Sequence, residues 1–170
     1  ITFFEIDPLV LRFARRYFTW LERSPAQVDV VLGDGRLSLE AVPPGEFDLL
    51  IIDAFNSSSI PVHLLTIEAV QLYLSRIKAD GVIALHITNR YLDLAAICER
   101  ARRSLGLAGG IISSPGDEQA LILPALYFLF ARDAQSLNVS WLSAPVLRAA
   151  PASVAAPWSD LRNNLFEVMR

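Results

Sequence analysis

Short apolar runs rich in β-branched and aromatic residues alternate along the chain with longer segments of helical spacing. The apolar runs are ITFFEI, VDVVL, FDLLIID, VIALHIT, GGIISS and LILPALYFLFA. Strands that alternate with helices are typical of a three-layer α/β domain with a mostly parallel sheet. FDLLIID is apolar without alternation, as in a parallel strand covered on both faces. The sequence therefore predicts an α/β domain.

The helical segments begin at recognisable starting residues. After Asp7, Pro8 suits a first helical turn, and an apolar stripe runs from Leu9 to Leu21. A second helix is expected from about His63 to Lys78, because Asp80-Gly81 follows as a stop signal. A third is expected over RYLDLAAICERARRSLG.

Composition limits the classes of protein that the chain resembles. Its 170 residues are 53% hydrophobic and 19% charged, which predicts one folded domain over residues 1–170. Ala, Pro and Ser accumulate from about residue 133, so 133–170 is expected to be less regular. A net charge of −3 gives no general attraction to nucleic acid or to anionic membranes.

The cysteine, the two histidines and the longest apolar run argue against disulfide-bonded, metal-binding and membrane-spanning proteins. The one cysteine, Cys98, allows no intrachain disulfide and is expected to be a buried thiol. His63 and His86 are too few and too far apart to predict a metal site. The longest apolar run is shorter than the ~20 residues of a membrane span, and no targeting motif is present, so we expect a cytoplasmic location. Because the chain lacks an initiator Met and begins in a strand pattern, we expect a fragment of a longer protein.

Three carboxylates follow predicted strands. Glu5 ends the first, Asp34 comes just after the second, and Asp53 ends the third. Because ligands bind outside the carboxyl ends of strands in parallel α/β sheets, we expect the three acids on one rim. A strand-end carboxylate can accept from ribose hydroxyls, and Asp34 between two glycines can accept from an exocyclic base amine. The competing interpretation is structural, since acids at strand ends often cap helices and Gly-Asp-Gly is a common tight turn.

The stretches FFEID, VVLGDG, FDLLIIDAF, IPVHLLTIEAVQLYLSRIKADGVIALHITNRYLDL and WSDLRNNLFEVMR resemble the spermidine synthase family, especially its longer bacterial relatives. The resemblance covers nearly the whole chain. It implies a three-layer, Rossmann-like class I S-adenosylmethionine-dependent methyltransferase fold. It also implies aminopropyl transfer from decarboxylated S-adenosylmethionine, as co-substrate, to putrescine or a related amine. The product is 5′-methylthioadenosine, and no prosthetic group is expected.

The resemblance assigns roles residue by residue. Glu5 matches the acid that binds the ribose hydroxyls, Asp34 the acid that receives the adenine amino group, and Gly35 leaves room for the base. Asp53 matches the catalytic acid that orients the attacking amine and helps to remove its proton. A carboxylate suits this step, because a polyamine is cationic and its nitrogen must lose a proton before it attacks.

The chain departs from the family pattern near Asp53. Family members usually carry a second acid within a few residues, whereas here the sequence continues AFNSSS. Asn and Ser hydrogen-bond an ammonium group without neutralising it, so we expect weaker diamine affinity or a different substrate. Asn56, Ser58, Asn89 and Tyr91 are the expected residues that line the substrate site.

A strand and a glycine-rich loop that precede the ribose acid in the family are absent from this sequence. The strand would lie between those that end at Glu5 and Asp53. Buried backbone groups are rarely left unpaired. We therefore expect these two strands to pair directly or another chain to fill the gap, and we expect a homo-oligomer. An N-terminally truncated fold is also expected to hold only half of a nucleoside site.

Two further functions remain as alternatives. A methyltransferase on the same scaffold would prefer S-adenosylhomocysteine to 5′-methylthioadenosine. A non-catalytic oligomerisation or regulatory module would instead have a pocket closed by side chains.

Overall fold

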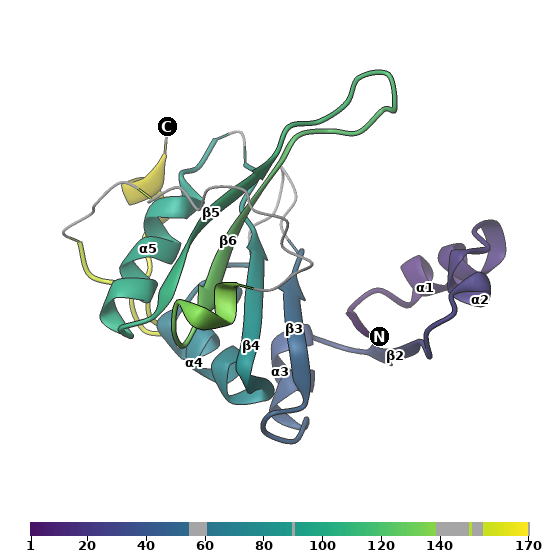
Figure 1. Cartoon of the computed structure of the whole chain (residues 1–170), viewed down its shortest axis with the longest axis horizontal. Helices are drawn as coiled ribbons and strands as arrows, with labels where there is room; N and C mark the ends of the chain where they lie inside the picture. Colours follow the sequence, from purple (N-terminus) through teal and green to yellow (C-terminus); the bar gives the residue numbers. More distant parts are fainter. Residues whose placement is uncertain (55–60, 90, 139–149, 151–154, 170) are drawn as a thin grey trace. The chain divides into compact units, whose positions relative to one another are not determined.

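A computed structural model describes residues 1–54, 61–89, 91–138, 150 and 155–169 (Figure 1). The chain divides into two compact units, Ile1–Val42 and Pro43–Arg170. The expectation of a single domain over residues 1–170 stays a prediction, and each unit is described by itself.

The first unit is a parallel strand pair with three helices. Its elements are β1 (Thr2–Glu5), α1 (Pro8–Tyr17), α2 (Trp20–Arg23), β2 (Asp29–Leu32) and α3 (Gly35–Glu40). β1 and β2 pair in register from Thr2 opposite Asp29 to Glu5 opposite Leu32. α1 begins as the sequence predicts, because the Asp7 side chain accepts from the Leu9 N–H and Pro8 occupies the first turn.

The second unit is built on a mixed four-stranded sheet in the order β3-β4-β6-β5. Its elements are β3 (Phe47–Ile52), η1 (Val62–Leu64), α4 (Ile67–Arg76), β4 (Ile77–His86), α5 (Leu94–Ser104), β5 (Ala108–Ser114), β6 (Ala125–Ala131), η2 (Gln135–Leu137) and η3 (Leu165–Val168). β3 and β4 are parallel, whereas β6 is antiparallel to both of its neighbours. The connection 115–124 is shorter than the dozen or more residues of a parallel crossover, so β5 and β6 form a hairpin. The hairpin extends beyond the sheet in Figure 1.

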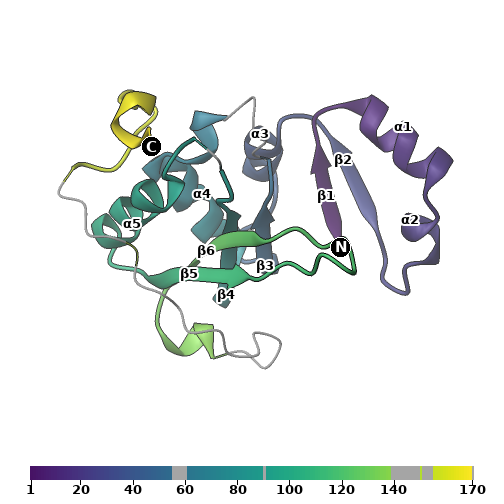
Figure 2. The same ribbon diagram turned by 90° about the horizontal axis from the view of Figure 1, so that it is seen from above.

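Both faces of the four-stranded sheet are covered in the second unit. α4 and α5 lie on one side and η2 on the other (Figure 2). Successive strand residues point to opposite faces, so Phe128 and Phe130 are fully buried while Leu129 and Ala131 join a second cluster. That second cluster also contains Leu137 of η2. The two-faced core explains why the strands read as continuous apolar runs.

One expectation about the elements is wrong. α4 ends at Arg76 rather than near Lys78, because Ile77 pairs with Phe47 and starts β4. β1 pairs with β2 in a two-stranded sheet, and the expectation that β1 also pairs directly with β3 stays a prediction, because the two strands belong to separate units. β1 therefore satisfies one edge through β2, and in the part of the chain described here its other edge has no strand partner. Filling of the gap by another chain stays a prediction.

Candidate active site

Three side chains form a row across the sheet of the second unit. Ile52 is in register with Leu85, so Asp53, the next residue, comes opposite His86 at the end of β4. His86 is in turn the ladder partner of Tyr127 on β6. Because paired residues point to the same face of a sheet, Asp53, His86 and Tyr127 lie together at the carboxyl ends of β3 and β4.

Hydrogen bonds and stacking fix the imidazole of His86 within this row. Its Nδ1 lies 2.6 Å from Oδ1 of Asp53, and its Nε2 lies 2.8 Å from Oγ1 of Thr88. Thr88 Oγ1 also accepts from the Leu126 N–H at 2.7 Å. The imidazole stacks on the Tyr127 ring with centroids 4.9 Å apart. Contacts with Asp53, Thr88 and Tyr127 therefore fix the position of the His86 ring.

The side chains of this row differ in their exposure to solvent. The Asp53 side chain is 56% exposed, whereas that of His86 is 20% exposed. Burial first, and the negative charge of Asp53 second, raise the pKa of the Tyr127 phenol above its ordinary value. Tyr127 is therefore a neutral hydrogen-bonding group at neutral pH, and Asp53 is the member of the row that a ligand reaches most easily.

Glu5 and Asp34 lie at one end of the strand pair in the first unit. Glu5 is opposite Leu32, and the Gly33 N–H donates to the Glu5 backbone oxygen at 2.9 Å, so the Gly-Asp-Gly turn adjoins the end of β1. Glu5 Oε1 accepts from the Asp7 N–H, and Asp34 Oδ1 caps α3 by accepting from the Leu37 N–H. The structure thus brings these two acids to the same end of the strand pair. Glu5 also stabilises the turn after β1, and Asp34 also caps α3.

The remaining predicted site residues have local roles or fall outside the description. Asn89 Oδ1 accepts from the N–H groups of Tyr91 and Leu92, so it shapes the turn after β4. Tyr91 is exposed. A Cβ added at Gly35 would lie 3.7 Å from Phe4 Cβ, an ordinary contact, so packing within this unit does not demand glycine there. Asn56 and Ser58 lie outside the described residues.

A family model for the spermine/spermidine synthase domain matches residues 1–108, which contain Glu5, Asp34, Asp53 and His86. The chain belongs to the spermine/spermidine synthase family. This confirms the resemblance that the sequence motifs carry.

Two curated relatives each match about half of the chain. A polyamine aminopropyltransferase from Vibrio vulnificus is 32% identical over 81 residues, which are 46% of this chain and 26% of the relative. An N-terminal histidine N-methyltransferase from Emericella nidulans is 32% identical over 85 residues, 50% of this chain and 15% of the relative. The chain therefore spans about a quarter or less of the length of these curated relatives.

A solved structure supports the fold over most of the chain. A spermidine synthase in complex with the transition state analogue AdoDATO superposes with a TM-score of 0.62 at 18% identity. The match covers 88% of this chain and 54% of that one. The expected Rossmann-like, class I methyltransferase-type fold is confirmed, with a sheet that is only partly parallel.

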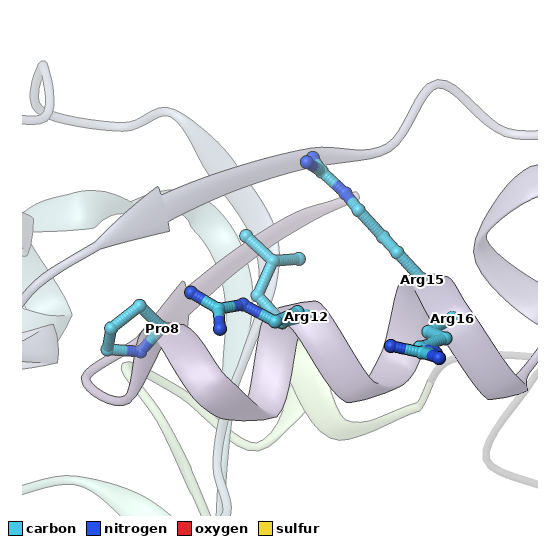
Figure 3. Close-up of a pocket in the computed structure, with 5 residues that line it drawn as sticks. Pro8, Arg12, Arg15 and Arg16 are labelled. Atoms are coloured by element: carbon cyan, nitrogen blue, oxygen red, sulfur yellow. The ribbon is translucent and has the colours of Figure 1, made fainter.

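A surface hollow on the first unit is separate from the predicted acids. It is lined by Pro8, Leu11, Arg12, Arg15 and Arg16 of α1 (Figure 3). Neither Glu5 nor Asp34 lines it, so it is not the nucleoside site that the spermidine synthase motifs predict.

Among the described residues, no group of three or more His, Cys, Asp or Glu side chains is placed to hold a metal ion. No helix in the described ranges is long and apolar enough to cross a membrane.

The sequence interpretation missed His86, Thr88 and Tyr127 as members of the site. For His86, the sequence argues only against a metal site. One signal was present, because FDLLIID ends with Asp53, VIALHIT carries His86 near its end, and both were expected in a mostly parallel sheet. Adjacent parallel strands bring such residues to the same edge of a sheet.

Proposed function

We propose that this chain carries the amine-acceptor part of an aminopropyltransferase site, with Asp53 as the catalytic acid. The observation that carries the proposal is the fixed position of Asp53 at the carboxyl end of β3, where His86 holds one carboxylate oxygen. The family and the exposed carboxylate support the same role. Asp53 attracts the ammonium form of the acceptor and orients its nitrogen.

The proposed reaction transfers an aminopropyl group from decarboxylated S-adenosylmethionine to putrescine or a related amine. The acceptor ammonium first gives a proton to Asp53 or to water. The nitrogen lone pair then forms the new N–C bond while the C–S bond breaks and its electron pair returns to sulfur. A sulfonium becomes a neutral thioether, 5′-methylthioadenosine, and the positive charge passes to the product amine. No prosthetic group takes part.

Glu5, Asp34 and Gly35 are proposed to bind the nucleoside of the co-substrate. Glu5 accepts from the ribose hydroxyls, Asp34 accepts from the adenine amine, and Gly35 lets the base approach. Their support is the shared end of β1 and β2, where the turn after β2 bonds to the end of β1. A further support is that a spermidine synthase of similar fold has been solved in complex with the transition state analogue AdoDATO.

Calorimetric titration of the purified chain with 5′-methylthioadenosine and with S-adenosylhomocysteine tests the nucleoside site. We expect 5′-methylthioadenosine to bind more tightly, and Glu5→Ala to weaken it by roughly tenfold or more, the worth of a charge-assisted hydrogen bond. Asp34→Ser removes the carboxylate but keeps a residue that caps α3, so its loss of binding would not reflect a lost helix start. Glu22→Ala, an exposed acid on α2, is the matched control.

The outcomes separate the three candidate functions. Preference for S-adenosylhomocysteine would favour the methyltransferase alternative. Binding of neither nucleoside would favour the non-catalytic alternative for this chain. Putrescine titration of wild type, Asp53→Asn and the exposed control Glu118→Ala tests the acceptor role, and binding that Asp53→Asn leaves intact would contradict it.

A further inference from the structure

His86 lies in a chain of hydrogen bonds that runs from a backbone amide to the Asp53 carboxylate. The Leu126 N–H donates to Thr88 Oγ1, Thr88 Oγ1 meets His86 Nε2, and His86 Nδ1 meets Asp53 Oδ1. The distances are 2.7, 2.8 and 2.6 Å, so each link is a good hydrogen bond. Thr88 is also anchored by its neighbour, because the Ile87 N–H donates to the Leu126 oxygen at 2.8 Å.

Donor and acceptor chemistry gives every link a direction. An ionised carboxylate only accepts, so the proton between Asp53 and His86 belongs to Nδ1. In the neutral imidazole Nε2 is then bare and accepts the Thr88 hydroxyl proton. The hydroxyl oxygen still accepts the Leu126 N–H, since it has two lone pairs. All the bonds therefore point toward Asp53 and polarise one another in the same sense.

From this chain of bonds we infer that His86 is a positioning residue for Asp53, locked in its Nδ1–H tautomer by Thr88 and by the carboxylate. The inference deepens the proposed function and rests on it, since the acceptor amine is the ligand that the function brings to Asp53. His86 holds Oδ1, and the carboxylate keeps a fixed orientation toward the solvent side. Thr88 acts on Asp53 through His86.

The charge of the pair defines the ligand that it suits. With a neutral imidazole, Asp53 and His86 together carry one negative charge, and the hydrogen bond spreads part of it onto the ring. This pair matches one ammonium group of an acceptor. The segment that follows in the sequence, AFNSSSIPV, supplies no second acid. The acceptor end that reacts is held by the oriented Asp53 carboxylate.

The tautomer is measured directly with ring ¹⁵N NMR on the unliganded chain. Only His63 and His86 contribute signals, and His63→Gln assigns them. At a pH where the imidazole is neutral, we expect a protonated Nδ1 and a bare Nε2 for His86. Thr88→Val removes the hydroxyl donor and should give a mixture of tautomers, whereas Thr88→Ser keeps the hydroxyl and the wild-type spectrum. An Nε2–H tautomer in the wild type, or identical spectra for Thr88→Val and Thr88→Ser, would overturn the inference.

Putrescine binding measures the consequence for Asp53. His86→Leu fills the site but donates nothing to Asp53, and we expect it to weaken binding about tenfold. His86→Gln keeps a side-chain N–H donor and should restore most of that loss. Equal binding by both variants would show that His86 only packs against Tyr127, and would contradict a positioning role.

The two measurements separate failure of the inference from failure of the proposed function. The NMR arm needs no ligand, so it decides the tautomer even for a chain that binds no amine. If the Nδ1–H tautomer and its dependence on Thr88 are found but the wild type binds no putrescine, the acceptor function fails and the positioning of Asp53 stands. If amine binding depends on Asp53 but the tautomer is Nε2–H, the function stands and the positioning role fails.

Discussion

At the scale of single residues, Glu99 shows how the protein stabilises a buried charge. Glu99 is 3% exposed on α5, yet both of its oxygens are bonded. Arg102 donates to each of them at 2.8 Å and Arg103 donates to Oε1 at 2.7 Å. Arg102 first, and Arg103 next among the favourable partners, lower the pKa of the Glu99 carboxyl despite its burial.

Glu99→Gln should lower the free energy of unfolding by about 2 kcal/mol at neutral pH, because it leaves arginines without their buried partner. Since the folded pKa is lowered, the stabilisation is present above the unfolded pKa of about 4.3 and is lost as pH falls through the folded value. Denaturant unfolding of wild type and variant at neutral and acidic pH measures both effects. Glu118→Gln, an exposed acid, is the control. A difference between wild type and Glu99→Gln that is independent of pH would contradict the ion-pair account.

At the scale of elements, the start of α4 is held by a segment far along the chain. The Thr66 side chain accepts from the Ala69 N–H and donates to Asp160 Oδ1 at 2.7 Å. The Ile67 N–H donates to the Trp158 oxygen, and the Trp158 side chain is buried. The cap of α4 thus ties the segment around Trp158 to the second unit.

Thr66→Val should lower the free energy of unfolding by about 1–2 kcal/mol, because it removes the hydroxyl that caps α4 and donates to Asp160. Thr66→Ser keeps both bonds and should cost less. Proteolysis near Trp158 should also become faster in Thr66→Val only, which separates loss of the tie from a general loss of stability. Equal stability and equal cleavage of the two variants would show that the hydroxyl is not needed.

The elements also show what the sequence determines and where it stops. Asp7-Pro8 predicted the start of α1 correctly, because capping is a local interaction. Cys98 is buried, as the helical pattern indicated, and burial raises the pKa of its thiol. The end of α4 and the contact of His86 with Asp53 were not predicted. Both depend on pairing with β3, which lies more than twenty residues away in the sequence, and a local pattern does not specify register between distant strands.

At the scale of the whole molecule, the two units differ in how much core they contain. In Ile1–Val42, all of which is described, Leu39 alone is buried. Large apolar side chains of this unit are more than half exposed, among them Phe13, Tyr17 and Trp20. A two-stranded sheet with so little burial is marginal in water, whereas the second unit buries whole strands on both faces.

Backbone hydrogen exchange should therefore be faster in β1 and β2 than in β4 and β6, by more than about a hundredfold. Exchange measured by mass spectrometry at two protein concentrations also tests the expected homo-oligomer. If a second copy covers the first unit or fills the edge of β1, protection of β1 and β2 rises with concentration while that of β4 stays constant. Protection of β1 equal to that of β4 at high dilution would contradict the prediction.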